Sequence, residues 1–239
     1  IKQLSMRSST DADRFLQLGV AKEKVLVTGN IKFDVTSVHT KEKFHPKWKA
    51  DSLIVVFGST RPGEEGPIMQ ALVKLQKEFP RLIGVIAPRH MERCREVEDL
   101  VREFEVNYGI LSKQDDLKNW TGNVLLIDSL GKLNAFYKTA AVTYVGGGFN
   151  PRFGGHNILE PAALGKPVLF GKFMNNFEEE AKLLRQSKGG LQLQNIEDIY
   201  NVLNRLLMNS DEREKLGQSA EKTVRANSGA LSRNIELIL

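Results

Sequence analysis

The sequence has very little cysteine and no long apolar run. Cys94 is the single cysteine among 239 residues, so no disulfide can form within the chain, which fits a reducing compartment. No apolar segment approaches the roughly 20 residues that a membrane-spanning helix requires. Cys94 lies in a charged helical pattern without a histidine or cysteine cluster nearby, which indicates an ordinary thiol.

Several catalytic and metal-binding motifs are also missing. The sequence contains no H-E-x-x-H, C-x-x-C or G-x-S-x-G motif and no carboxylate cluster that suggests a metal site, so neither a zinc site nor a serine-hydrolase nucleophile is indicated. The G-x-G-x-x-G fingerprint and the P-loop are absent as well. We therefore expect no metal and no bound cofactor.

The composition is that of a folded domain, with 41% hydrophobic and 26% charged residues. The formal net charge is +5, which suits an anionic ligand or an anionic membrane surface. The basic residues are scattered rather than gathered in a block, so a nucleic-acid groove is not favoured and we expect no nucleic-acid partner.

Short apolar runs alternate with helical patterns over most of the chain. Expected strands lie at 53–57, 81–88, 123–128, 141–148, 167–171 and 190–193, with helices between them. This alternation predicts an α/β fold, a Rossmann-like doubly wound parallel sheet. We expect residues 1–50 to combine the end of a preceding lobe with a polar linker, and residues 51–239 to form the main domain.

The unusual residues gather in loops that follow expected strands, where parallel sheets bind ligands. The segment from Gly146 to Pro161 (GGGFNPRFGGHNILEP) contains five glycines, which allow the backbone to approach a ligand closely. Asn157 can cap the helix that carries Glu160, and an ionised carboxylate there can accept hydrogen bonds from ribose hydroxyls. A capping box that merely ends a loop is the alternative interpretation.

Three other loops are weaker candidates. Arg89 and His90 follow a strand, where arginine suits a phosphate or carboxylate, although a solvated basic helix start explains them equally well. The loops at 58–66 (GSTRPGEEG) and 128–133 (DSLGKL) could bind phosphate or form simple capped turns. Lys32 lies in a turn before the linker and could reach a cleft, or be an exposed loop lysine.

In this order, these segments resemble the 3-deoxy-D-manno-octulosonic acid (Kdo) transferases. The similarity rests on DADRFLQLG, VTGNIKFD, GSTRPGEE, APRH, LGKLNAFY and above all GGGFNPRFGGHNILEPAALGKPVLFG, and it covers nearly the whole chain. It implies the C-terminal, donor-binding lobe of a GT-B glycosyltransferase. The implied activity is transfer of Kdo from CMP-Kdo, a substrate rather than a cofactor, to a lipid A precursor in lipopolysaccharide synthesis.

The resemblance also assigns residues. It places CMP contacts at Pro88, Arg89, Gly131, Lys132, Leu133, Asn157, Ile158, Leu159 and Glu160, and it matches Lys32 to a lysine that stabilises the departing charge. Arg152 and His156 are candidate partners for the Kdo carboxylate. Arg61 stands where many relatives carry histidine, so the resemblance leaves its role open.

The implied mechanism is inverting and independent of metal. The family's general base, a glutamate, lies in an N-terminal lobe, which we expect to be absent here. That lobe would also carry the acceptor site and the contact with the cytoplasmic face of the bacterial inner membrane. We expect the chain alone to bind donor without transferring it. The alternatives are a GT-B enzyme that uses a UDP-sugar, a UDP-sugar epimerase, or a non-catalytic nucleotide-binding or membrane-docking module.

Overall fold

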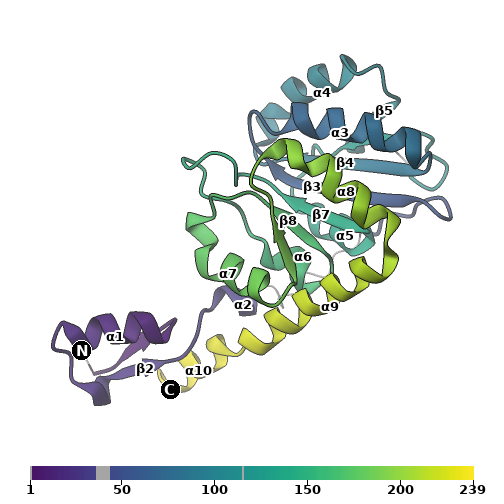
Figure 1. Ribbon diagram of the computed structural model, residues 1–239. Coiled ribbons are helices and arrows are strands. Elements are labelled where there is room, and N and C mark those ends of the chain that lie inside the picture. The colour runs from purple at the N-terminus through teal and green to yellow at the C-terminus, as the bar shows by residue number, and fades with distance from the viewer. Residues whose placement is uncertain (1, 36–43, 115) are drawn as a thin grey trace. The chain divides into compact units, whose positions relative to one another are not determined.

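The computed structural model describes residues 2–35, 44–114 and 116–239 (Figure 1). The chain folds into two compact units, one of Ile1–Thr40 with Lys222–Leu239 and one of Lys41–Glu221. No helix among the described residues combines the length and the apolar character needed to cross a bilayer.

The larger unit is built on a seven-stranded sheet. All its pairings are parallel, and the strand order is β5-β6-β4-β3-β7-β8-β9. The strands are β3 (Leu53–Thr60), β4 (Leu82–Pro88), β5 (Tyr108–Ile110), β6 (Val124–Leu126), β7 (Val142–Val145), β8 (Val168–Phe170) and β9 (Gly190–Gln192). This confirms the predicted doubly wound α/β fold.

Helices connect the strands and cover the sheet (Figure 1). They are α3 (Glu65–Glu78), α4 (Cys94–Arg102), α5 (Leu133–Thr139), α6 (Leu159–Ala163), α7 (Glu178–Gln186) and α8 (Ile199–Met208). Single turns of 3-10 helix lie at η2 (Met91–Arg93), η3 (Leu111–Lys113), η4 (Asn175–Phe177) and η5 (Ile196–Asp198). The predicted strands and helices are all present, whereas β5 was not predicted.

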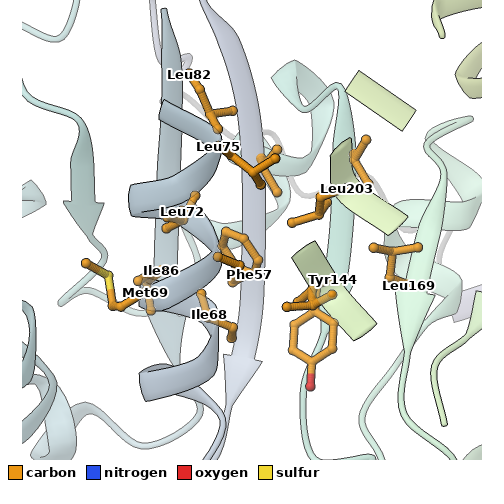
Figure 2. Close-up of a cluster of buried hydrophobic side chains, with 14 of the residues drawn as sticks. Phe57, Ile68, Met69, Leu72, Leu75, Leu82, Ile86, Tyr144, Leu169 and Leu203 are labelled. Atoms are coloured by element: carbon orange, nitrogen blue, oxygen red, sulfur yellow. The ribbon is translucent and has the colours of Figure 1, made fainter. Parts of the chain in front are cut away.

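The core of this unit lies between the sheet and helices α3 and α8. Figure 2 shows side chains of α3, including Leu72 and Leu75, directed toward the strands that carry Phe57 and Tyr144. The Phe57 and Tyr144 rings lie 6.1 Å apart between centroids. Because alternate residues of a strand face opposite sides, Gly58 faces α5, where an added Cβ would lie 1.9 Å from the Tyr137 hydroxyl. Packing on both faces fixes where the strand ends lie.

The described part of the predicted linker packs on this unit. Trp48 donates a hydrogen bond from Nε1 to Thr139 Oγ1 at 3.0 Å, and its ring lies 5.9 Å from that of Phe136. Phe44 lies 5.5 Å from the Phe136 ring. The segment is irregular, as its sequence predicts, but its aromatic side chains attach it to α5. Residues 36–43 of the expected linker lie outside the described residues.

The smaller unit contains β1 (Leu4–Met6) paired in parallel with β2 (Val25–Val27), together with helix α1 (Ser9–Gln17), η1 (Lys22–Lys24) and α2 (Lys32–Val35). Helix α9 (Ser210–Asn227) leads into this unit and α10 (Ala230–Glu236) belongs to it. The Asp34 carboxylate accepts hydrogen bonds from the backbone N–H groups of Gly229 at 2.5 Å and Leu231 at 2.7 Å, at the start of α10. Sequence patterns did not indicate this return of the chain to its N-terminal segment.

Candidate functional site

The topology of the larger unit creates one switch point. The chain runs outward from β3 to β4 and then returns to β7 on the other side of β3. Connections on the two sides of such a point leave in opposite directions, so a crevice opens beyond the carboxyl ends of the strands. The loops after β3 and β7 therefore meet where the sequence predicts a ligand.

Glu64 joins these two loops. Its Oε2 accepts the backbone N–H of Arg61 at 3.0 Å, and its Oε1 accepts the backbone N–H of Gly147 at 2.8 Å. The side chain is buried, and burial raises the pKa of the Glu64 carboxyl to about 7. One carboxylate thus holds the glycine-rich loop against the turn that carries Arg61.

The contact of Glu64 with the two loops leaves no room for a side chain at Gly146. An added Cβ there would lie 2.5 Å from both Glu64 Oε2 and the backbone oxygen of Ser59. Gly147 has φ of +83°, a conformation that suits glycine. Two of the predicted loop glycines are thus explained by close approach and backbone conformation.

Arg61 lies at the centre of three loops. Its Nε donates to His156 Nε2 at 3.0 Å, and its Nη1 donates to His90 Nε2 at 2.6 Å. Its guanidinium carbon lies 4.6 Å from the centroid of the Phe153 ring. The loops after β3, β4 and β7 therefore converge on one guanidinium.

His156, the half-buried histidine that Arg61 contacts, is neutral. Burial, and then the charges of Arg61 and Arg89, lower the pKa of His156 to about 4. Because Nε2 accepts the Arg61 hydrogen bond, the ring proton of His156 lies on Nδ1. His156 can donate a hydrogen bond to a ligand near neutral pH but brings no positive charge.

Asn157 and Glu160 lie at the start of α6, as predicted. Asn157 Oδ1 accepts the backbone N–H of Leu159 at 3.1 Å, and its Nδ2 donates to Glu160 Oε1 at 3.1 Å. Burial raises the pKa of Glu160, and Arg89 opposes that shift through its charge. The amide thus orients a partly buried carboxylate that experiences the Arg89 charge.

The other predicted residues are spread around these loops. Pro88 ends β4, the backbone N–H of Arg89 donates to Thr60 O at 3.0 Å, and Gly131 has φ of +76° before α5. The Lys132 ammonium lies 4.5 Å from the Phe44 ring centroid. Ile158 and Leu159 are buried and Leu133 begins α5, so these three contribute packing or backbone.

Arg152 and Lys32 are exposed, as are Arg89 and Gly131. Arg152 lies in the loop after β7, and its backbone N–H donates to Asn150 Oδ1 at 3.0 Å. Lys32 begins α2, in the smaller unit. Its assignment to the departing charge stays a prediction. Within the described ranges, no group of three or more histidine, cysteine or acidic side chains could hold a metal ion.

Sequence reasoning assigned Glu64 no role, although it lies in a candidate loop. Its only signal was a carboxylate three residues after Arg61, a pattern typical of a capped turn. The partner that explains it, Gly147, lies 83 residues away in sequence. Beside Glu64, a small cleft of about 180 Å³ is lined by Pro62, Gly63, Phe149, Asn150 and Phe153.

Comparison with known proteins shows a similarity to Kdo transferases. A family profile described as 3-deoxy-D-manno-octulosonic-acid transferase matches residues 1–35. A curated 3-deoxy-D-manno-octulosonic acid transferase of Haemophilus influenzae is 32% identical over all of this chain, which spans 56% of that protein. The Chlamydia pneumoniae enzyme of the same name is 31% identical over 95% of the chain, which spans 53% of it. The whole chain is thus similar to Kdo transferases.

The chain spans about half the length of these Kdo transferases. Among solved structures, the C-terminal CMP-Kdo binding domain of WaaA from Acinetobacter baumannii matches with a TM-score of 0.69 and 28% identity, over 74% of this chain and 91% of that one. A UDP complex of Staphylococcus aureus MnaA matches with a TM-score of 0.62 and 16% identity, over 99% of this chain and 61% of that one. At that identity the likeness shows a shared fold alone.

Proposed function

We propose that this chain is the donor-binding half of a glycosyltransferase that moves Kdo from CMP-Kdo to a lipid A precursor. The observation that carries the proposal is that the loops after β3, β4 and β7, which carry Arg61, Arg89 and Glu160, meet at the switch point of the sheet. Basic side chains suit a phosphate, and a fixed carboxylate suits ribose hydroxyls. The similarity to a CMP-Kdo binding domain gives independent support for the same ligand.

The site residues take distinct roles in this proposal. Arg89 binds the CMP phosphate, and Glu160, oriented by Asn157, accepts hydrogen bonds from the ribose. Lys32 stabilises the charge that grows on the departing phosphate, as positioned cations do in other transferases. The nucleotide site is completed, through backbone and packing, by Pro88, Gly131, Lys132, Leu133, Ile158 and Leu159.

The proposed reaction is an inverting displacement. The acceptor hydroxyl oxygen attacks the anomeric carbon of Kdo from the face opposite the phosphate, and the bond from that carbon to the phosphate oxygen breaks. The hydroxyl proton passes to the general base that the family carries in its N-terminal lobe, and CMP leaves with the electron pair. The reaction needs no metal because Arg89 and Lys32 supply the positive charge, and it takes place at the cytoplasmic face of the inner membrane.

Calorimetric titration of the 239-residue chain with CMP, UDP and CMP-Kdo tests the proposal. We expect CMP and CMP-Kdo to bind and UDP to bind more weakly. Tighter binding of UDP would instead favour a UDP-sugar enzyme, and no binding of any of the three would contradict a donor site. Incubation with CMP-Kdo and a lipid A precursor should give no product with this chain alone, so turnover would contradict our assignment of the base.

A further inference from the structure

Arg61 is held in place without an acidic partner. Its two side-chain hydrogen bonds go from Nε to His156 and from Nη1 to His90. No carboxylate of the described residues lies within ion-pair distance of its guanidinium, and Nη2 makes no hydrogen bond to them. Since guanidinium groups present planar pairs of N–H donors, part of this fork remains available to an acceptor.

Two further arginines, Arg89 and Arg93, act on Arg61 through their charges. Burial, together with the charges of Arg89 and Arg93, lowers the pKa of Arg61, and Glu64 opposes that effect. Arg93 has its own partners, Glu65 at 2.7 Å and Glu96 at 2.9 Å. Neither the Arg61 nor the Arg89 guanidinium forms an ion pair with a carboxylate of the described residues, although the Glu160 carboxylate experiences the Arg89 charge.

The proposed donor carries two anionic groups, the phosphate of CMP and the carboxylate of the octulosonic acid. Family similarity assigns Arg89 to the CMP part. Of the remaining candidates, His156 is neutral and already accepts a hydrogen bond from Arg61. Arg152 is exposed. Arg61 is the remaining cation whose orientation is fixed by the loops around it.

We propose that Arg61 binds the carboxylate of the donor sugar, so that it selects acidic nucleotide sugars over neutral ones. This inference rests on the proposed function. His90 and His156 act as positioning residues, because each accepts one N–H of the guanidinium and so directs the rest of the fork. The Phe153 ring supports one face of it.

The test compares CMP with CMP-Kdo, because only the second ligand carries the carboxylate. In calorimetric titrations of the 239-residue chain, Arg61→Gln should weaken CMP-Kdo binding by about tenfold to a hundredfold, the usual value of a charged hydrogen bond. The same change should weaken CMP binding by less than about threefold, within the variation expected of a neighbouring contact. Thermal unfolding of each variant verifies that it folds.

Arg81→Gln is the matched control. Arg81 is an exposed arginine paired with Asp51 at 2.8 Å, at the opposite end of β4 and about 20 Å from the loops at the rise of an extended strand. The substitution removes the same charge, so it should leave both affinities unchanged. A loss confined to Arg61→Gln therefore reflects a local contact rather than net charge.

The other outcomes overturn the proposal in distinguishable ways. Equal weakening of CMP and CMP-Kdo by Arg61→Gln would make Arg61 a positioning residue for the loops. A selective loss of CMP-Kdo with Arg152→Gln instead would move the carboxylate site to Arg152. If the unsubstituted chain bound neither ligand, the proposed function itself would fail, whereas binding of CMP with no preference for CMP-Kdo would refute the carboxylate contact alone.

Discussion

The buried carboxylate of Glu64 should make the stability of the larger unit depend on pH. Burial raises its pKa in the folded state to about 7, from 4.5 for the exposed group. A raised pKa means that the folded state binds this proton more tightly than the unfolded state. The resulting stabilisation is complete below about pH 4.5 and is lost as the pH rises through about 7.

The size of the effect follows from the shift. One pKa unit corresponds to about 1.4 kcal/mol, so the Glu64 contribution amounts to roughly 3 kcal/mol between about pH 4.5 and pH 8. Glu64→Gln removes the titration but leaves a neutral side chain of the same shape. Its amide can accept a hydrogen bond from only one of the two backbone N–H groups, which leaves the other unpaired. At acid pH the free energy of unfolding of the variant is therefore about 1–3 kcal/mol lower than that of the parent chain.

Urea unfolding at a series of pH values measures this effect. Both tryptophans, Trp48 and Trp120, lie in the larger unit, so their fluorescence reports its unfolding. The relevant quantity is the unfolding free energy of the parent chain minus that of Glu64→Gln. This difference cancels the opposing effect of His156, whose lowered pKa costs stability as the pH falls below about 6.5.

We expect the difference to fall as the pH rises from about 5 to 8, so that the parent chain loses its advantage over the variant. A difference that is constant over this range would mean that Glu64 is not desolvated. A difference that grows with pH would mean that the two backbone N–H groups lower the pKa of Glu64 by more than burial raises it. Either result would refute the conclusion that burial dominates the pKa of Glu64.

The remaining predictions concern the loops and the nucleotide. Gly146→Ala should destabilise the fold by about 1–3 kcal/mol, since the new methyl meets Glu64 and a backbone oxygen. At Gly66 nothing lies within 4 Å of an added Cβ, so Gly66→Ala should leave the free energy of unfolding, measured in urea, nearly unchanged or slightly higher. Arg89→Ala and Glu160→Ala should each weaken CMP binding in calorimetry by about tenfold or more, and unchanged affinity would favour a non-catalytic module. EDTA should leave CMP affinity unchanged, and a loss would contradict metal independence.

The architecture was predictable because each main element carries a strong local signal. Helix α3 lies between the expected strands at 53–57 and 81–88, and the apolar runs of β3 and β4 are continuous as in a buried parallel sheet. The elements that sequence reasoning missed are short. Strands β1 and β5 have three residues each and α2 has four, so their formation depends on partners elsewhere in the chain.

The candidate site was predictable in part for the same reason. Asn157 and Glu160 are three residues apart, so the local sequence indicates their contact. The apolar runs likewise indicate that the candidate loops follow the ends of strands. The roles of Glu64 and Arg61 could not be predicted in this way, because the residues that they contact lie more than 80 positions away in the sequence. Glu64 contacts Gly147, and Arg61 contacts His156. Such pairs follow from strand order, and strand order is fixed by the packing of the whole sheet.

Strand order also gives the arginine cluster its chemical meaning. Parallel neighbours end at the same edge, so β3, β4 and β7 deliver Arg61, Arg89 and His156 to one place. Bringing two guanidinium groups together costs free energy that the free protein recovers only in part, because His156 is neutral, Glu64 binds backbone N–H groups and Glu160 acts on Arg89 without forming an ion pair. A ligand that supplies negative charge to both guanidinium groups recovers that energy only when bound, so the same repulsion favours a donor with two anionic groups over one with a single phosphate.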